Sequence, residues 1–302
     1  MGGTVPSRIR KREAELKPRN KPVPMLNEDI RSQLSETARK LRVKVIKMLS
    51  RAGCGHPGGS LGMADIFTAL YFGGFLKHDP KNPGWEDRDR LVLSNGHICP
   101  ILYAALSERG YFPDEWLDDL RQVGARLQGH PAMHKTPGVE LSTGSLGHGV
   151  CGALGMALTL RLDGKESRVW ALMGDGELQE GLPWEAFMAA AHYRASNLTV
   201  VVDVNDAQID GRTRDVMGLE PLADKFRAFG FEVIELDGHS YDEIFAGFNT
   251  AIAVSDKPTC ILARTTMGKG VSYMEAEGYK WHGKTPGPEQ TEQALAELGA
   301  SL

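Results

Sequence analysis

The chain has 302 residues, of which 41% are hydrophobic and 25% charged, a size and balance typical of a protein with one large hydrophobic core. The formal net charge of -4 excludes a global attraction to nucleic acid or anionic membranes, and no apolar stretch is long enough to span a bilayer. Four widely spaced cysteines, without a Cys-x-x-Cys pair or a secretory signal, favour a cytoplasmic protein.

The N-terminal segment is rich in basic residues and prolines. Residues 1–27 hold seven Lys and Arg residues, and the prolines among them disfavour a helix. We therefore predict an extended basic N-terminal arm over residues 1–27, followed by one α/β domain over residues 28–302. We interpret the arm as a segment that is solvated or covers a partner, with a nucleic-acid-binding tail as the alternative.

The first part of the domain is predicted to be mainly helical. Apolar spacing from Ser35 to Leu49 indicates an amphipathic helix that ends at Gly53. The other elements expected in this part are a strand over 91–93 and helices over 61–76, 99–108 and 113–123. The segment 124–149 is rich in Gly, Pro, His and Thr and is too long for a simple connector, which favours a functional loop.

The second part alternates strands with helices. Strands are expected over 169–173, 198–204, 231–236 and 259–263, and helices over 147–162, 181–195 and 241–253. This alternation predicts an α/β fold with a doubly wound, mostly parallel sheet and helices on both faces. The tail over 288–298 is compatible with a short helix or a disordered end.

Two polar motifs follow neighbouring strands. Gly174-Asp175-Gly176 ends one apolar run and Asn205 ends the next, so both are expected at the carboxyl edge of the sheet, where α/β proteins bind ligands. A carboxylate, an amide oxygen and a loop carbonyl suit a hard octahedral cation that also binds phosphate oxygens. Gly176 would let the backbone approach the phosphates. The motifs therefore predict a metal-bridged diphosphate site.

Several histidines lie on loops expected around the same edge. They are His56, His97, His130, His148 and His282. A single loop histidine is more often solvated or structural, but their joint placement favours proton transfer, because imidazole donates and accepts protons near neutral pH. Cys54 and Cys99 lie beside His56 and His97, so a nucleophilic Cys-His pair is an alternative; buried packing is favoured for the cysteines.

These motifs together resemble those of the transketolase family. The segments that carry the resemblance, in family order, are Gly55–Gly62, Leu93–His97, Gly129–Pro131, Thr143–Gly147, Gly174–Gly181, Ile209–Gly211 and Trp281–Gly283. The resemblance runs from about Leu34 to about Gly283 and covers only the first half of a transketolase, which holds the cofactor diphosphate. The chain thus resembles the N-terminal subunit of a split transketolase, with the thiamine diphosphate-binding fold of that half.

The resemblance implies a role for each motif residue. Metal ligands for Mg²⁺ or Ca²⁺ would be Asp175, Asn205 and the carbonyl of Ala207. Contacts to thiamine diphosphate would come from His97, Gly144, Ser145, Leu146, Gly174, Asp175, Gly176, Glu180, Asn205, Ile209 and His282. The catalytic residues would be His56, His282 and His130, of which His56 and His282 are the candidates for proton transfer at the sugar carbonyl and hydroxyl.

Some positions depart from the family pattern or allow a second interpretation. Ala207 replaces a bulkier apolar residue, Ser145 stands where many transketolases have proline, and His148 stands where glutamine is more common, so His148 is interpreted as structural. Glu180 resembles a carboxylate that couples the two active sites across the dimer interface, or it is an exposed glutamate at a helix start. Lys269 and Lys284 either hold phosphate or are solvated.

The resemblance also implies an activity and a partner. The activity is transfer of a two-carbon ketol unit from a ketose phosphate to an aldose phosphate. The glutamate that activates the cofactor belongs to the pyrimidine-binding domain, so we expect the chain to be inactive without a C-terminal transketolase subunit, with two copies of each chain in the assembly. Alternatives are ketol transfer on a sulfonated or branched sugar, a deoxyxylulose-phosphate-synthase-like reaction, and a non-catalytic scaffold subunit.

Overall fold

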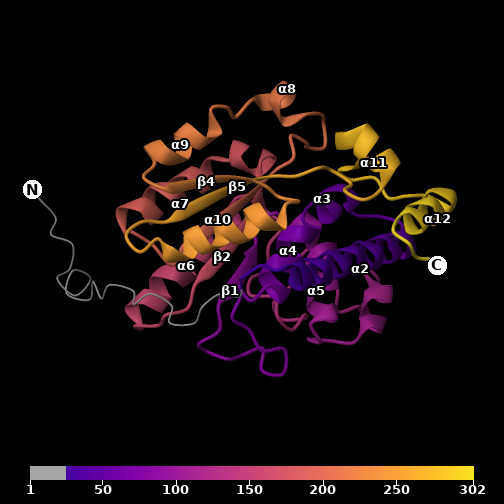
Figure 1. The fold of residues 1–302 in the computed structure, drawn as a ribbon, viewed down its shortest axis with the longest axis horizontal. Coiled ribbons are helices and arrows are strands. Elements are labelled where there is room, and N and C mark those ends of the chain that lie inside the picture. Colours follow the sequence, from indigo (N-terminus) through magenta and orange to yellow (C-terminus); the bar gives the residue numbers. More distant parts are fainter. Residues whose placement is uncertain (1–24) are drawn as a thin grey trace, which may run out of the picture.

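The described residues form a sheet of five parallel strands. The computed structural model describes residues 25–302, so almost all of the predicted basic arm lies outside the described residues. The strands are β1 (Arg90–Leu93), β2 (Val169–Gly174), β3 (Leu198–Val204), β4 (Glu232–Asp237) and β5 (Thr259–Arg264). Their order is β1-β2-β3-β5-β4, and every neighbouring pair is parallel (Figure 1). The predicted parallel α/β sheet is confirmed.

Helices cover both faces of this sheet. They are α2 (Glu28–Ala52), α3 (Pro57–Gly62), α4 (Ala64–Phe72), α5 (Cys99–Glu108), α6 (His148–Leu162), α7 (Gly181–His192), α8 (Thr213–Met217), α9 (Leu222–Ala228), α10 (Tyr241–Ala253), α11 (Ser272–Glu277) and α12 (Pro288–Glu297). Short 3-10 helices lie at Gly96–Ile98, Asp114–Asp119, Gly176–Gln179 and Gly278–Trp281.

The core is split into two layers by the sheet. Successive strand side chains point to opposite faces, so Trp170 and Leu172 of β2 pack with α2, α4, α5 and α10, while Ala171 and Met173 pack with α6, α7 and α9. Both faces are buried, which explains why the strands read as continuous apolar runs. Among the residues described, no helix is long and apolar enough to cross a membrane.

Three helix predictions differ from the structure. The helix expected from Ser35 begins at Glu28, because Asn27 caps it by accepting a hydrogen bond from the backbone N–H of Ile30 (2.8 Å). The helix expected over 61–76 is two helices, α3 and α4, that meet at Met63. The helix expected over 113–123 is only a 3-10 turn, and the positive φ of Arg121 (64°) prevents its continuation.

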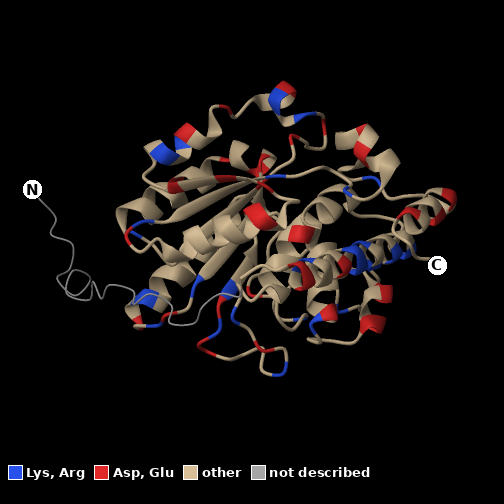
Figure 2. Cartoon of the chain, in the orientation of Figure 1, with Lys and Arg blue, Asp and Glu red and all other residues tan. Residues whose placement is uncertain are grey.

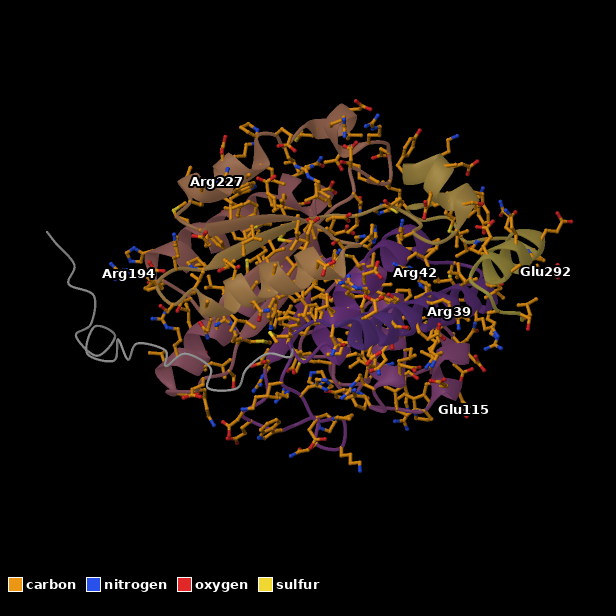
Figure 3. The ribbon with its side chains drawn as sticks, viewed as in Figure 1. Arg39, Arg42, Glu115, Arg194, Arg227 and Glu292 are labelled. Atoms are coloured by element: carbon orange, nitrogen blue, oxygen red, sulfur yellow. The ribbon has the colours of Figure 1, made fainter. Side chains whose placement is uncertain are left out.

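The C-terminal tail, for which two outcomes were open, is a helix. α12 packs on α2, where Thr291 donates to the Ser50 hydroxyl (3.0 Å) and Leu295 is buried. Figure 2 shows Lys and Arg residues gathered along α2. One of them, Arg42 (labelled in Figure 3), is buried and pairs with Asp65 of α4 (2.6 Å). The tail and α2 therefore form one packed side of the domain.

Candidate active site

Polar segments follow the carboxyl ends of four neighbouring strands. Ser94 follows β1, Asp175 follows β2, Asn205 follows β3 and Thr265 follows β5. Because all the strands are parallel, these residues lie along one edge of the sheet, which is where doubly wound sheets bind ligands.

Asp175 and Asn205 are brought together at this edge, as expected. One Asp175 carboxylate oxygen accepts from the N–H of Asp206 (2.7 Å) and the other from the N–H of Gly176 (2.7 Å). Asn205 Oδ1 accepts from the N–H of Ala207 (3.0 Å). Burial raises the pKa of Asp175 to about 6. A buried carboxylate is costly to ionise unless a cation or more donors approach it, so this arrangement suits a bound divalent ion.

A second buried carboxylate, Asp203, was not identified from the sequence. It accepts from Asn205 Nδ2 (2.7 Å) and from the hydroxyl of Thr265. Burial, reinforced by the charge of Asp175, raises the pKa of Asp203 to about 7. Because Asp203 engages the amide nitrogen, it fixes the side-chain orientation of Asn205 and leaves Oδ1 as the available ligand atom. The signal in the sequence was an acidic residue inside the apolar run of β3.

Three of the predicted histidines form one cluster. The ring centroids of His56 and His97 are 5.0 Å apart, those of His97 and His282 are 5.0 Å apart, and those of His56 and His282 are 5.7 Å apart. Burial lowers the pKa of His56 to about 4, lowers the pKa of His97 well below its ordinary value, and lowers the pKa of His282. Burial therefore favours the neutral form of these imidazoles.

The cluster contains polar atoms without partners. The Nδ1 atoms of His56 and His282, and Oδ1 of the nearby Asn95, are buried and make no hydrogen bond within the described chain. An unsatisfied buried polar atom costs about 1–3 kcal/mol. A ligand rich in oxygen and nitrogen would satisfy these atoms, so the residues present fit a phosphorylated cofactor with a sugar beside it.

The long loop over 124–147 packs on the segment after β1. A Cβ atom at Gly96 would lie 2.7 Å from the Thr143 hydroxyl, and one at Gly144 would lie 3.2 Å from the ring of His130. Gly144 has a φ of +153°, a conformation that glycine adopts easily. The predicted turn Gly144–Leu146 and the exposed His130 therefore border the histidine cluster on one side.

The remaining predicted residues lie at the rim. Ile209 is 67% exposed. A Cβ atom added at Gly283 would lie 3.6 Å from Cδ1 of Ile209 and 3.6 Å from the ring of His56. Glu180 is exposed at the start of α7 without a side-chain cap. His148 is the exposed first residue of α6.

The contacts of two lysines and two cysteines bear on the interpretations left open for them. Lys269 lies near Glu275 (3.8 Å), and the Lys284 ammonium lies over the Trp281 ring (4.6 Å to its centroid). Cys99 is buried with a pKa raised to about 12 by burial, which excludes it as a thiolate nucleophile at neutral pH. Cys54 is exposed, so the expectation that the cysteines are buried is wrong for this residue.

Two further charged residues border the site and were missed. Arg121 donates to the carbonyl of Gly129 (3.3 Å), and its charge adds to burial in lowering the pKa of His130 and of His56. Glu177 is buried directly behind Asp175. Within the described range no group of three or more His, Cys, Asp or Glu residues could hold a metal ion. The predicted ligand set contains only one such residue, Asp175, and is not of that type.

Comparison with known proteins identifies relatives of this chain. The family model described as transketolase, thiamine diphosphate binding domain, matches residues 32–301. The 6-deoxy-6-sulfo-D-fructose transketolase subunit of Clostridium sp. (strain MSTE9) is 44% identical over 265 residues, which are 88% of this chain and 96% of that subunit. One subunit of the apulose-4-phosphate transketolase of Phocaeicola vulgatus is 39% identical over 263 residues, which are 87% of this chain and 92% of that subunit.

Full-length transketolases match over part of their length. Human transketolase is 37% identical over 272 residues, which are 89% of this chain but 42% of that protein. The crystal structure of the Campylobacter jejuni transketolase superposes with a TM-score of 0.84 at 37% identity, covering 91% of this chain and 44% of that one. The chain thus spans less than half the length of these two proteins.

Proposed function

This chain belongs to the transketolase family, in which it corresponds to the thiamine diphosphate-binding domain, and we propose on that premise that, with a partner polypeptide, it transfers a two-carbon ketol unit from a ketose phosphate to an aldose phosphate. The observation that carries the proposal is the cluster of His56, His97 and His282, with two buried nitrogens that lack partners, in a domain whose parallel strands end in Asp175 and Asn205 at one edge. The predicted resemblance to the N-terminal subunit of a split transketolase is confirmed by the family match and the subunit relatives.

The diphosphate end of the cofactor would be held at the tips of β2 and β3. Asp175, Asn205 Oδ1 and the carbonyl of Ala207 would bind Mg²⁺ or Ca²⁺, because hard cations prefer oxygen ligands. Asn205 Oδ1 accepts one hydrogen bond from Ala207 and keeps a second lone pair for the ion. Gly174 and Gly176 flank Asp175 and let the backbone approach the phosphates.

The chemistry at the sugar combines the cofactor with the histidines of this chain. When bound, thiamine diphosphate supplies a carbanion that can take up and release the two-carbon unit. The neutral imidazoles of His56 and His282 would accept the proton of a sugar hydroxyl as the carbon–carbon bond breaks, and would return it to the carbonyl oxygen when the bond forms. His97 would contact the cofactor, and the exposed His130 would bind substrate oxygens.

The partner would be a C-terminal transketolase subunit that carries the pyrimidine-binding domain, with two copies of each chain. The chain covers 42% of human transketolase, and two relatives of matching length are named as subunits. Large apolar side chains are also exposed near the site and on α7: Ile209 (67%), Met217 (60%) and Met188 (62%). We propose that the partner covers these side chains in the assembly. The four unpaired cysteines support our expectation of a cytoplasmic location.

A sulfonated or branched sugar is the second candidate substrate. Its support is the 44% identity to a subunit whose name specifies 6-deoxy-6-sulfo-D-fructose, and the 39% identity to one whose name specifies apulose 4-phosphate. A sulfonate and a phosphate are both tetrahedral anions, so the histidines described above are compatible with either.

The proposal is tested by purifying the chain with and without the subunit encoded beside its gene. Cofactor binding is measured by titration with thiamine diphosphate and Mg²⁺, and ketol transfer is assayed with phosphorylated, sulfonated and branched ketoses. We expect activity only in the mixture. If neither the chain nor the mixture binds the cofactor, the chain is a scaffold; turnover by the chain alone would refute the partner requirement.

A further inference from the structure

Glu177 is a buried carboxylate whose partners all come from loops around the site. It lies in the turn after β2 and is 2% exposed. It accepts hydrogen bonds from the hydroxyl of Ser94, from the N–H of Gly147 (2.7 Å) and from the N–H of Gly174 (3.2 Å). These partners are all uncharged. An acid in this position costs more than an apolar side chain of similar size, so packing alone does not account for it.

The partners of Glu177 begin or end the segments that face the proposed cofactor. Ser94 opens the segment leading to His97, Gly147 closes the loop that contains Gly144, and Gly174 precedes Asp175. The Ser94 hydroxyl also accepts from the N–H of Val150 (3.1 Å), which extends the network to the start of α6. One side chain therefore links the ends of β1 and β2 to the entry of α6.

Close backbone packing at the same point leaves little room for movement. A Cβ at Gly149 would lie only 2.5 Å from the Cα of Ser94. Gly147 is the N-cap of α6, has a φ of +81° and supplies no side-chain cap, so its orientation depends on backbone contacts such as the one to Glu177. Loss of the Glu177 carboxylate would release Gly147 and Ser94 together.

We propose that Glu177 is a positioning residue that fixes the segments 94–97, 144–147 and 174–176 in the geometry that binds the cofactor, before the cofactor arrives. This inference rests on the proposed function for the identity of the ligand, but the loop network exists without it. The three donors occupy both oxygens of the carboxylate, two on one oxygen and one on the other. A glutamine would place an NH₂ group against one of the donors.

The test compares Glu177→Gln and Glu177→Met with Glu177→Asp and with a matched control, Glu166→Gln, at an exposed glutamate before β2. Hydrogen exchange of the cofactor-free chain is followed by mass spectrometry in segments 93–98 and 143–150 and in β3 and β5. We expect Gln and Met to speed exchange by about tenfold or more in the two segments only. Asp should restore part of the protection, and Glu166→Gln should change nothing.

Cofactor affinity is the second readout. Thiamine diphosphate and Mg²⁺ should bind the Gln and Met variants, assembled with the partner, about 10–100-fold more weakly than the wild type, as for other residues that orient ligand-binding groups. Unchanged exchange in both segments, or exchange that rises equally in β3 and β5, would overturn the positioning role. If the wild-type assembly binds no cofactor, the proposed function fails, and the exchange measurement still decides whether Glu177 organises the loops.

Discussion

At the scale of the residue, Asp175 is a buried carboxylate, and burial disfavours its charged form in the cofactor-free chain. Its carboxylate holds the N–H groups of Gly176 and Asp206, and its pKa is raised to about 6 by burial. Asp175→Asn keeps the shape but removes the charge that would bind the metal. We expect thiamine diphosphate binding in the presence of Mg²⁺ to weaken at least about 100-fold. The cofactor-free chain should stay folded with a lowered thermal midpoint, because the amide NH₂ would face the N–H of Gly176 or of Asp206. Asp163→Asn, at an exposed position, is the control, and equal binding by both variants would contradict the ligand assignment.

Asp203 gives a prediction about pH. Its folded-state pKa of about 7 lies above the ordinary aspartate value of 3.8, so between these values the folded chain holds a proton that the unfolded chain has released. The contribution of Asp203 to stability therefore falls as pH rises through about 7 and recovers as pH falls. Lowered histidine pKa values act in the opposite direction, so the comparison must be with Asp203→Asn. The free energy of unfolding of both proteins is measured with urea, in EDTA, from pH 5.5 to 8. Over this range the difference between the two proteins should change by about 1–3 kcal/mol. Parallel pH profiles would show that Asp203 does not titrate in this range.

At the scale of the element, the strands and their adjacent helices follow from the sequence, because apolar runs and periodic spacing are local properties. The structure confirms strands at 198–204 and helices at 99–108 and 241–253. The interruption at Met63 depends instead on non-local packing of α3 against the loop after β5. The same reason explains why Asp203 and Glu177 were missed: their importance depends on partners such as Thr265 and Gly147, which are distant in the sequence.

The α3 contact gives a prediction at this scale. A Cβ at Gly58 would lie 2.1 Å from Met267 Sδ and 2.9 Å from the carbonyl of Trp281, next to His282. Gly58→Ala should therefore lower the free energy of unfolding by about 1–3 kcal/mol and displace the helix that follows His56. Gly84→Ala is the matched control, because a Cβ there meets nothing within 4 Å. Denaturant unfolding of both variants checks this. Equal stability of the two variants would show that the loop after β5 moves aside without any loss of stability.

At the scale of the whole molecule, the sheet edge presents the residues proposed to bind the cofactor, and several large apolar side chains of the domain are exposed, among them Ile209, Met188 and Met217. Since the chain covers 44% of the Campylobacter jejuni transketolase, we propose that the site is completed from outside this domain. Met188 on α7 and Met217 at the end of α8 are both more than half exposed, and we propose that the partner subunit covers the surface that carries them.

Charge placed on that surface should separate assembly from folding. Met188→Glu and Met217→Glu put a carboxylate where we expect an apolar contact, and burying an unpaired charge at an interface costs several kcal/mol. Each variant alone should unfold at the wild-type temperature, because its side chain is already in contact with water, but should bind the partner subunit at least about 10-fold more weakly and lose ketol transfer in proportion. Met25→Glu, at an exposed residue before α2, is the control. Sedimentation velocity with the partner measures the assembly, and wild-type association of both α7 and α8 variants would place the interface on another face of the chain.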